Sequence, residues 1–283
     1  MPKLLTEDQI ERFREDGFLC PVPVLTPEEA AAARARLESV EARHPGDVKK
    51  LKSKAHVLCP WVGDIARHPR ILDAFEDLIG ADILCYSMAF RAKEADGATF
   101  AGWHQDSAYS RIRPLVVLGA LALSDCTPAS GCLRAIPGSH QWGALPHAET
   151  GDAASILARG QYISAEFDSS SAVDLVLRPG EIGFFDYRVV HGSGPNSSSD
   201  RRIMLLVEMM PSSARQTEGR ESAMLVRGED RHGNFDADPR PDAELSEASL
   251  AAWREVVGLR AKTIYSDSHL PIPEAYGGGS AKP

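Results

Sequence analysis

The chain has 283 residues, of which 43% are hydrophobic and 25% charged, and its net charge is −9 at pH 7. This length and composition allow one large domain or two small ones, and the acidic balance argues against a broad nucleic-acid-binding surface. No apolar run reaches the roughly 18 residues of a membrane span. We therefore expect neither nucleic acid nor a membrane as partner, and the sequence does not indicate an oligomeric state.

The cysteines and the opening residues bear on the cellular compartment. The five cysteines are scattered and form no CxxC pair, which is typical of reduced thiols rather than of a disulfide framework. The opening stretch, MPKLLTEDQIERFREDGF, is charged and lacks the apolar core of a secretion signal. We expect a cytoplasmic protein.

The first part of the chain carries three helix signals. Thr6 is predicted to cap a helix over about residues 7–16, which a glycine ends. Thr26 is followed by a proline and two glutamates, a strong start signal for a second helix. Residues 65–79 repeat apolar side chains at helical spacing and also end at a glycine. We expect a helical part over about residues 1–80.

Between residues 83 and 210 the pattern changes to short apolar runs separated by turns. The runs include ILCYSMAFRA, LVVLGALALSD and RRIMLLVEMM, and the turns include TPASG, PGSH and GPNSSSD. Helices followed by many short strands predict an antiparallel sandwich or barrel with helices packed outside. Strands and helices do not alternate and there is no glycine-rich phosphate loop, so a doubly wound nucleotide-binding fold is not expected.

The chain turns polar after this region, and one further helix is predicted over about residues 246–261. We see no internal repeat and no linker. The prediction for residues 1–283 is a single domain of mainly β class with flanking helices. Its core covers about residues 81–211, and a polar C-terminal extension covers about residues 212–283.

The segment AGWHQDSAY offers two metal-binding side chains. Residues two apart on a strand point to the same face, so His104 and Asp106 project together while Trp103 and Gln105 face the other way. Two histidines and one carboxylate on one face of an iron ion leave three positions open, an arrangement typical of non-haem iron(II) oxygenases. His-x-Asp alone is weak support, because the pattern often arises by chance.

A third ligand has to come from another part of the chain. His191 ends an apolar strand, FFDYRVV, and begins a glycine-rich turn, HGSGPN. A histidine at a strand end beside a tight turn can reach an open site at the mouth of a barrel. Spacing alone leaves open the alternative that His191 is an ordinary buried or surface histidine.

Two arginines begin the strand that returns from this turn. A guanidinium binds a carboxylate through two parallel hydrogen bonds. Neighbours on a strand face opposite ways, so only one of Arg201 and Arg202 can point inward, and periodicity does not say which. The alternative is a pair of surface charges.

These blocks together resemble the phytanoyl-CoA dioxygenase family. Five blocks occur in the family's order and spacing: WHQD, TPASGCLRAIPGSH, LRPGE, HGSGPN and the RR that follows it. The N-terminal segment EDGFLCPVPVLTPEE also resembles the family's entry segment. The resemblance covers about residues 5–240. It implies a double-stranded β-helix fold (a jelly roll, cupin-like), with iron(II) as metal, 2-oxoglutarate as cosubstrate and O2 as oxidant.

The resemblance also implies roles for individual residues. His104, Asp106 and His191 match the three iron ligands. Arg202 matches the position that pairs with the far carboxylate of 2-oxoglutarate. Related halogenases carry a small residue in place of the ligand carboxylate, so the presence of Asp106 implies hydroxylation or desaturation rather than halogenation.

The substrate is less well defined. Arg91 and Lys93 share one strand face, and Lys93 matches a lysine common in this region of the family; the alternative is a solvated outer face. Tyr109 is a candidate for the entrance or for packing. Residues 222–241 resemble a bacterial branch that includes enzymes acting on 2-aminoethylphosphonate. We predict hydroxylation of a C–H bond of a small polar molecule, such as an aminophosphonate or a related zwitterion.

Three alternatives remain at this stage. The first is a natural-product tailoring oxygenase that hydroxylates, desaturates or epoxidises a larger metabolite. The second is a jelly-roll binding protein without catalysis. The third is a zinc hydrolase built from the same two histidines and one carboxylate.

Overall fold

The computed structural model describes residues 2–114 and 116–278. Its α-helices are α1 (Glu7–Asp16), α2 (Pro27–Arg43), α3 (Ala55–Leu58), α4 (Pro60–Ala66), α5 (Pro69–Ile79) and α6 (Glu247–Ile264). Its strands are β1 (Phe18–Pro23), β2 (Ile83–Lys93), β3 (Ala101–His104), β4 (Ile112–Arg113), β5 (Val117–Ala122), β6 (Leu133–Ala135), β7 (His147–Ala148), β8 (Tyr162–Ile163), β9 (Val173–Leu175), β10 (Glu181–Asp186), β11 (His191–Ser193), β12 (Arg202–Pro211), β13 (Arg215–Gln216), β14 (Ser222–Arg227) and β15 (Asp236–Ala237). None of the described helices is long and apolar enough to cross a membrane.

The helix signals in the sequence are largely confirmed. Thr6 and Thr26 cap α1 and α2, each in a capping box with the residue three positions on. Gly17 ends α1 in the left-handed region, with φ of 79°. The helix predicted over residues 65–79 is in fact the end of α4 followed by α5, because a proline begins α5 and prevents one continuous helix.

Two sheets form the centre of the molecule. A seven-stranded sheet has the order β1-β10-β5-β12-β2-β14-β15, and a four-stranded sheet has the order β3-β11-β6-β9. The pairing is antiparallel except between β14 and β15. Apolar residues of both sheets, such as Leu118, Phe185, Leu133 and Leu175, form one cluster, so the sheets pack face to face. The predicted jelly-roll class is confirmed.

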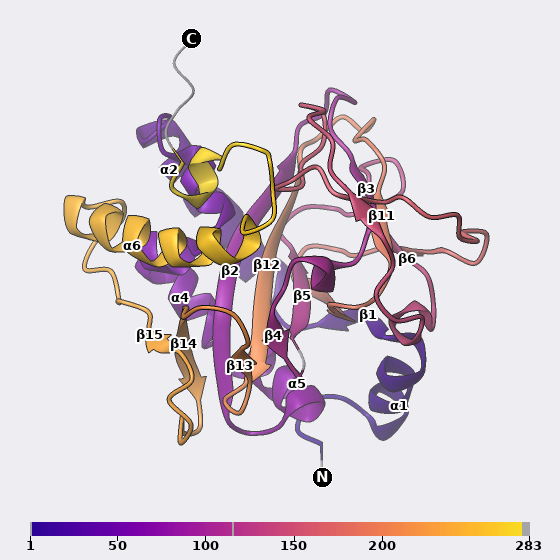
Figure 1. Ribbon diagram of the computed structural model, residues 1–283, viewed down its shortest axis with the longest axis horizontal. Coiled ribbons are helices and arrows are strands. Elements are labelled where there is room, and N and C mark those ends of the chain that lie inside the picture. The colour runs from indigo at the N-terminus through magenta and orange to yellow at the C-terminus, as the bar shows by residue number, and fades with distance from the viewer. Residues whose placement is uncertain (1, 115, 279–283) are drawn as a thin grey trace.

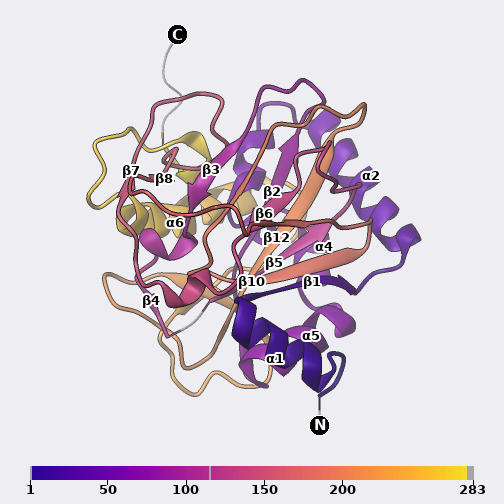
Figure 2. The same ribbon diagram turned by 90° about the vertical axis from the view of Figure 1, so that its right-hand side faces the viewer.

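The outer face of the large sheet is covered by helices. A second apolar cluster joins outward residues of β12 and β10 to side chains of the helices, among them Leu37, Phe75 and Trp253. In Figure 1 α2, α4 and α6 lie on one side of β2 and β12, and β3, β11 and β6 lie on the other. Figure 2 shows α1 and α5 below the sheet, next to β1.

Strand β12 divides its side chains between these two layers. Ile203, Leu205 and Val207 belong to the helix-covered cluster. Arg202, Met204, Leu206 and Glu208 alternate with them and line a cavity between the sheets. A register shift opposite Glu208 places an extra residue in β2, which lets Tyr86 line the same cavity.

The C-terminal extension is joined to the body of the protein by a buried charged cluster. The Lys54 ammonium lies 2.9 Å from the Asp238 carboxylate and donates to the Ser222 carbonyl at 2.6 Å. The His56 Nε2 atom lies 2.8 Å from the same carboxylate. Burial by itself raises the pKa of Asp238, but Lys54 and His56 outweigh it and hold this pKa well below its ordinary value.

We expect that Asp238→Asn lowers the free energy of unfolding by about 3 kcal/mol, because it leaves the Lys54 charge buried without a counter-charge. The depressed pKa means that this stabilisation is complete above the unfolded-state pKa of about 4 and is lost as the pH falls below it. Denaturant unfolding at neutral and acidic pH measures both effects. Asp236→Asn, at an exposed ion pair two residues away, is the matched control and should change little. Equal effects of the two substitutions would contradict this role.

Candidate active site

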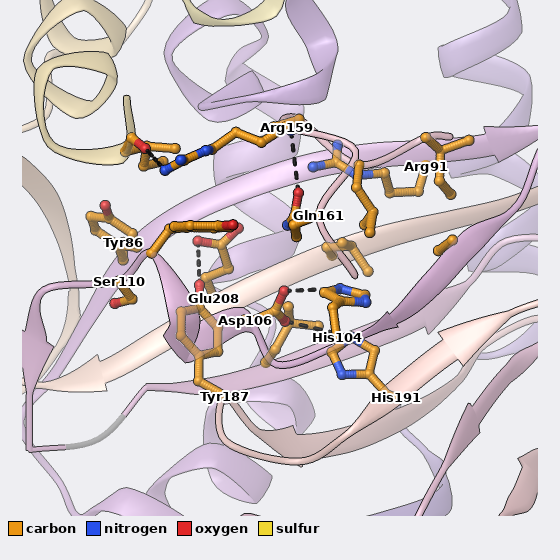
Figure 3. A pocket seen from close by; sticks show the side chains of 18 of the residues that line it. Tyr86, Arg91, His104, Asp106, Ser110, Arg159, Gln161, Tyr187, His191 and Glu208 are labelled. Carbon is orange, nitrogen blue, oxygen red and sulfur yellow. Dashed lines mark hydrogen bonds and ion pairs between the residues drawn. The ribbon is translucent and has the colours of Figure 1, made fainter. Parts of the chain in front are cut away.

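Two neighbouring strands bring the candidate histidines together. His104 ends β3 and His191 begins β11, and the two residues are direct partners in the antiparallel ladder. Directly opposed residues on a ladder point to the same face. Their imidazole rings are accordingly 4.2 Å apart between centroids. The carboxylate of Asp106, which opens a short 3₁₀ turn after β3, faces both rings (Figure 3).

The three side chains present their free atoms to one point. The Nε2 atom of His104 lies 3.4 Å from one carboxylate oxygen of Asp106, and that of His191 lies 3.7 Å from the other. The set has all its ligand atoms within 4.8 Å of one another. Ligands about 2.1 Å from a metal and at right angles to each other lie about 3 Å apart, so closing on an ion needs only a small contraction.

The protonation pattern suits metal binding. The Nδ1 atoms of His104 and His191 lie 2.8 and 3.0 Å from backbone carbonyl oxygens, which only accept, so Nδ1 carries the proton and Nε2 keeps its lone pair. Burial, followed by the nearby His104, lowers the pKa of His191 to about 4 and keeps it neutral at pH 7. One oxygen of Asp106 is buried without a hydrogen-bond partner among the described residues. A divalent metal ion fits this donor set.

Gln105 fixes the segment that carries two of the candidate ligands, His104 and Asp106. As predicted, its side chain faces away from them. It donates to the carbonyls of Gly143 and Arg188 at 2.9 and 2.8 Å and accepts from the Leu145 N–H at 2.9 Å. These three bonds to two separate loops make the position of the His104–Asp106 segment rigid.

The structure distinguishes the two arginines, which strand periodicity alone could not, and agrees with the choice of Arg202 that the resemblance implies. Arg201 points outward and pairs with Glu41 at 2.6 Å and Glu94 at 2.9 Å. Arg202 points into the cavity, is 1% exposed, and has no carboxylate partner among the described residues. Within residues 2–114 and 116–278, its Nε and one terminal nitrogen are buried without a hydrogen-bond partner, and its other terminal nitrogen lies 3.3 Å from the sulfur of Met204. A buried guanidinium left in this state fits an anionic ligand.

The three candidate substrate-binding residues lie in two different environments. Arg91 and Tyr109 line the cavity. Lys93 is buried opposite Arg202 on β2, where its ammonium donates to the Ser193 hydroxyl at 2.7 Å and to the Gly194 carbonyl. Burial, followed by the neighbouring charge of Arg202, lowers the pKa of Lys93 to about 7. Lys93 is not among the described residues that line the cavity, so Arg91 and Lys93 share a strand face without sharing an environment.

Several polar residues of the cavity were not predicted from the sequence. They are Tyr86, Tyr187, Glu208, Glu221 and Arg260. Counting alternate positions along β12 from Arg202 would have found Glu208. Arg260 lies on α6, and no local pattern indicates that the predicted polar extension returns to close the cavity.

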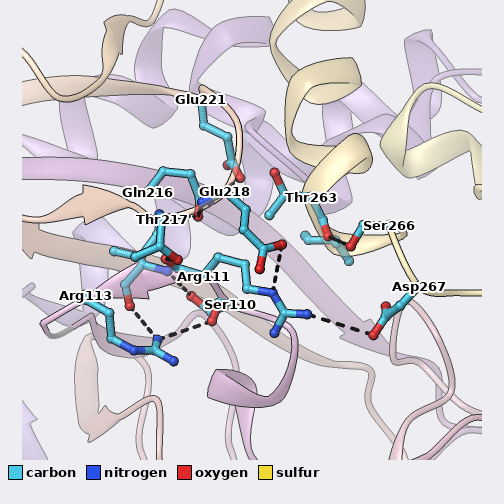
Figure 4. Close-up of polar contacts among 12 residues, drawn as sticks. Ser110, Arg111, Arg113, Gln216, Thr217, Glu218, Glu221, Thr263, Ser266 and Asp267 are labelled. Atoms are coloured by element: carbon cyan, nitrogen blue, oxygen red, sulfur yellow. Dashed lines mark hydrogen bonds and ion pairs between the residues drawn. The ribbon is translucent and has the colours of Figure 1, made fainter.

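The mouth of the cavity is lined by ion pairs that join separate segments. Arg159 pairs with Glu149 and with Asp267 at 2.8 Å, and its guanidinium lies 3.7 Å from the centroid of the Tyr109 ring. Arg111 lies 3.3 Å from Glu218 and 3.9 Å from Asp267 (Figure 4). The loop after the His104–Asp106 segment is therefore tied to the segment that follows α6.

This chain is similar in sequence to known oxygenases. A sequence profile of the phytanoyl-CoA dioxygenase family matches residues 13–204. The ectoine dioxygenase of Bordetella parapertussis is 26% identical over 69% of this chain and 71% of that protein. The methylphosphonate hydroxylase of Gimesia maris is 25% identical over 72% of this chain and 80% of that protein.

The fold of this chain is also similar to solved structures of non-haem iron enzymes. The non-heme monooxygenase ThoJ superposes with a TM-score of 0.82 at 32% identity, over 92% of this chain and 98% of that one. CytC3 in complex with Fe(II) and alpha-ketoglutarate superposes with a TM-score of 0.65 at 22% identity, which shows a shared fold. With the profile matching most of its length and two histidines and an aspartate converging on one point, the chain belongs to the phytanoyl-CoA dioxygenase family of iron(II)- and 2-oxoglutarate-dependent oxygenases.

Proposed function

We propose that this protein hydroxylates a C–H bond of a small polar molecule, with His104, Asp106 and His191 as its iron ligands. The observation that carries the proposal is the convergence of these three side chains. Both Nε2 atoms keep their lone pairs, and one Asp106 oxygen has no hydrogen-bond partner in the described part of the chain. Iron(II) in such a site supplies, with 2-oxoglutarate and O2, the oxidising power to break a C–H bond, with succinate and CO2 as co-products.

Arg202 is proposed to bind the far carboxylate of 2-oxoglutarate. Its guanidinium is buried in the cavity without a counter-charge among the described residues, and a carboxylate there would receive charge-assisted hydrogen bonds. Lys93 and Ser193 lie beside it. Lys93 acts here as support, because its amino group is held by Ser193 and Gly194 beside Arg202.

The remaining work of the chain is positioning. The cavity is lined by apolar side chains such as Leu118, Leu133 and Ile156 between its polar groups, which keeps bulk water away from the metal ligands. Arg91 and Tyr109 line the same cavity and are proposed to contact the substrate. The four buried cysteines are free thiols, which supports a reducing compartment and our placement of the protein in the cytoplasm.

The metal assignment is tested by adding iron(II) and 2-oxoglutarate without oxygen and recording the visible charge-transfer band of the chelate. We expect the native protein to develop the band and Asp106→Ala to lose it together with oxygen-dependent succinate formation. Asp125→Ala, at an exposed carboxylate outside the cavity, is the control and should behave as the native protein. A full band and full turnover in Asp106→Ala would refute the ligand assignment.

The two adjacent arginines give a second test. Arg202→Ala should raise the 2-oxoglutarate concentration needed for half-maximal succinate formation by about ten- to a hundred-fold, because a charge-assisted pair is removed. Arg201→Ala removes an outward ion pair with Glu41 and should leave that concentration nearly unchanged. If both variants needed the same increase, Arg202 would not be the anchor of the cosubstrate.

A further inference from the structure

The cavity contains a carboxylate that the oxygenase assignment does not use. Glu208 lies on the inner face of β12, and its side chain is 6% exposed. One of its oxygens, Oε2, accepts from the Tyr187 hydroxyl at 2.6 Å and from Arg260 at 2.8 Å. The other oxygen, Oε1, has no hydrogen bond from the described residues. Glu208 lines the cavity, so this oxygen is an acceptor available to a ligand.

A second buried carboxylate lies nearby. Glu221 is 1% exposed and accepts from the Tyr86 hydroxyl and from Gln216 at 2.6 Å, both of which are neutral donors. Arg260, whose guanidinium lies 4.4 Å from the centroid of the Tyr86 ring, is the cation paired with Glu208. We call Glu208, Glu221, Arg260, Tyr86 and Tyr187 the acidic end of the cavity, because this set contains two carboxylates and one guanidinium.

Other cations near the acidic end are already paired. The Lys54 ammonium lies 5.3 Å from the centroid of the Tyr86 ring but is bound to Asp238. Arg159 and Arg111 each have carboxylate partners at the mouth. The described residues therefore leave this end of the cavity with an excess of one negative charge.

The opposite end of the cavity is positively charged. Arg202 and Glu208 lie six residues apart on the same face of β12, which corresponds to about 20 Å along an extended strand. Arg202 and Arg91 supply the positive end. Figure 3 shows Glu208 beside Tyr187, between Tyr86 and Asp106.

We propose that the substrate carries a positively charged nitrogen, which donates a hydrogen bond to Oε1 of Glu208. This inference rests on the proposed function and makes Glu208 a specificity-determining residue. A cation is favoured by the excess carboxylate, whereas an anionic group would meet Glu208 and Glu221 unfavourably. A zwitterion can bind with its ammonium at the acidic end, and a purely anionic substrate is disfavoured.

Three probes of the same shape and different charge test this inference. Benzylammonium, benzyl alcohol and benzoate are titrated by calorimetry into oxygen-free protein saturated with iron(II) and 2-oxoglutarate. We expect benzylammonium to bind at least ten-fold more tightly than the other two. Glu208→Gln should remove this preference by weakening the amine at least ten-fold while leaving the alcohol unchanged. Glu166→Gln, at an exposed glutamate outside the cavity, should behave as the native protein.

The inference is overturned if benzoate or benzyl alcohol binds as tightly as the amine, if none of the three binds, or if Glu208→Gln keeps the preference. Should Glu208→Gln fail to fold because Arg260 loses its partner, Glu221→Gln removes the excess charge and leaves that pair intact, and it should weaken the amine several-fold. The charge-transfer band distinguishes a failure of the proposed substrate class from a failure of the proposed oxygenase site. A normal band without amine preference refutes the substrate class alone, and a missing band refutes the oxygenase site.

Discussion

The pairing of β3 with β11 is the constraint on which the rest of the site depends. One antiparallel register places His104 directly opposite His191, and the turn after β3 adds Asp106 between them. The three bonds of Gln105 and the two carbonyls that accept from the Nδ1 atoms then remove most of the remaining freedom. A shift of this register by one residue would turn one imidazole to the other face and separate the ligands.

The charged residues of β12 give the cavity two ends of opposite charge. The strand carries Arg202 at one end of its inner face and Glu208 at the other, while its outer residues pack under the helices. A cavity with opposite charges at its two ends suits two ligands that differ in charge. The same strand therefore separates the proposed cosubstrate from the proposed substrate nitrogen. The chain closes this arrangement with α6, which brings Arg260 to Glu208.

The sequence predicted those parts of the fold that are marked by neighbouring residues in the chain. Capping residues and glycines marked α1 and α2, and turn residues marked the strands of the jelly roll. The proposed ligands followed from a motif and a family resemblance, and the structure brings their side chains together. Arg202 was chosen over Arg201 only through that resemblance, because strand periodicity leaves the choice open. What could not be predicted depends on register and long-range packing: the burial of Lys93 away from the cavity and the return of Arg260 from the predicted polar extension. Neither periodicity nor composition contains that information, because each contact joins residues far apart in the chain.

The central claim is that two imidazoles and one carboxylate from three positions bind the same metal ion. X-ray absorption spectroscopy of the iron(II)-loaded protein measures this most directly, since imidazole ligands give a recognisable outer-shell scattering pattern. The account predicts two imidazole ligands in the native protein and one in His191→Ala. An unchanged imidazole contribution in His191→Ala would show that β11 does not supply a ligand and would contradict the account.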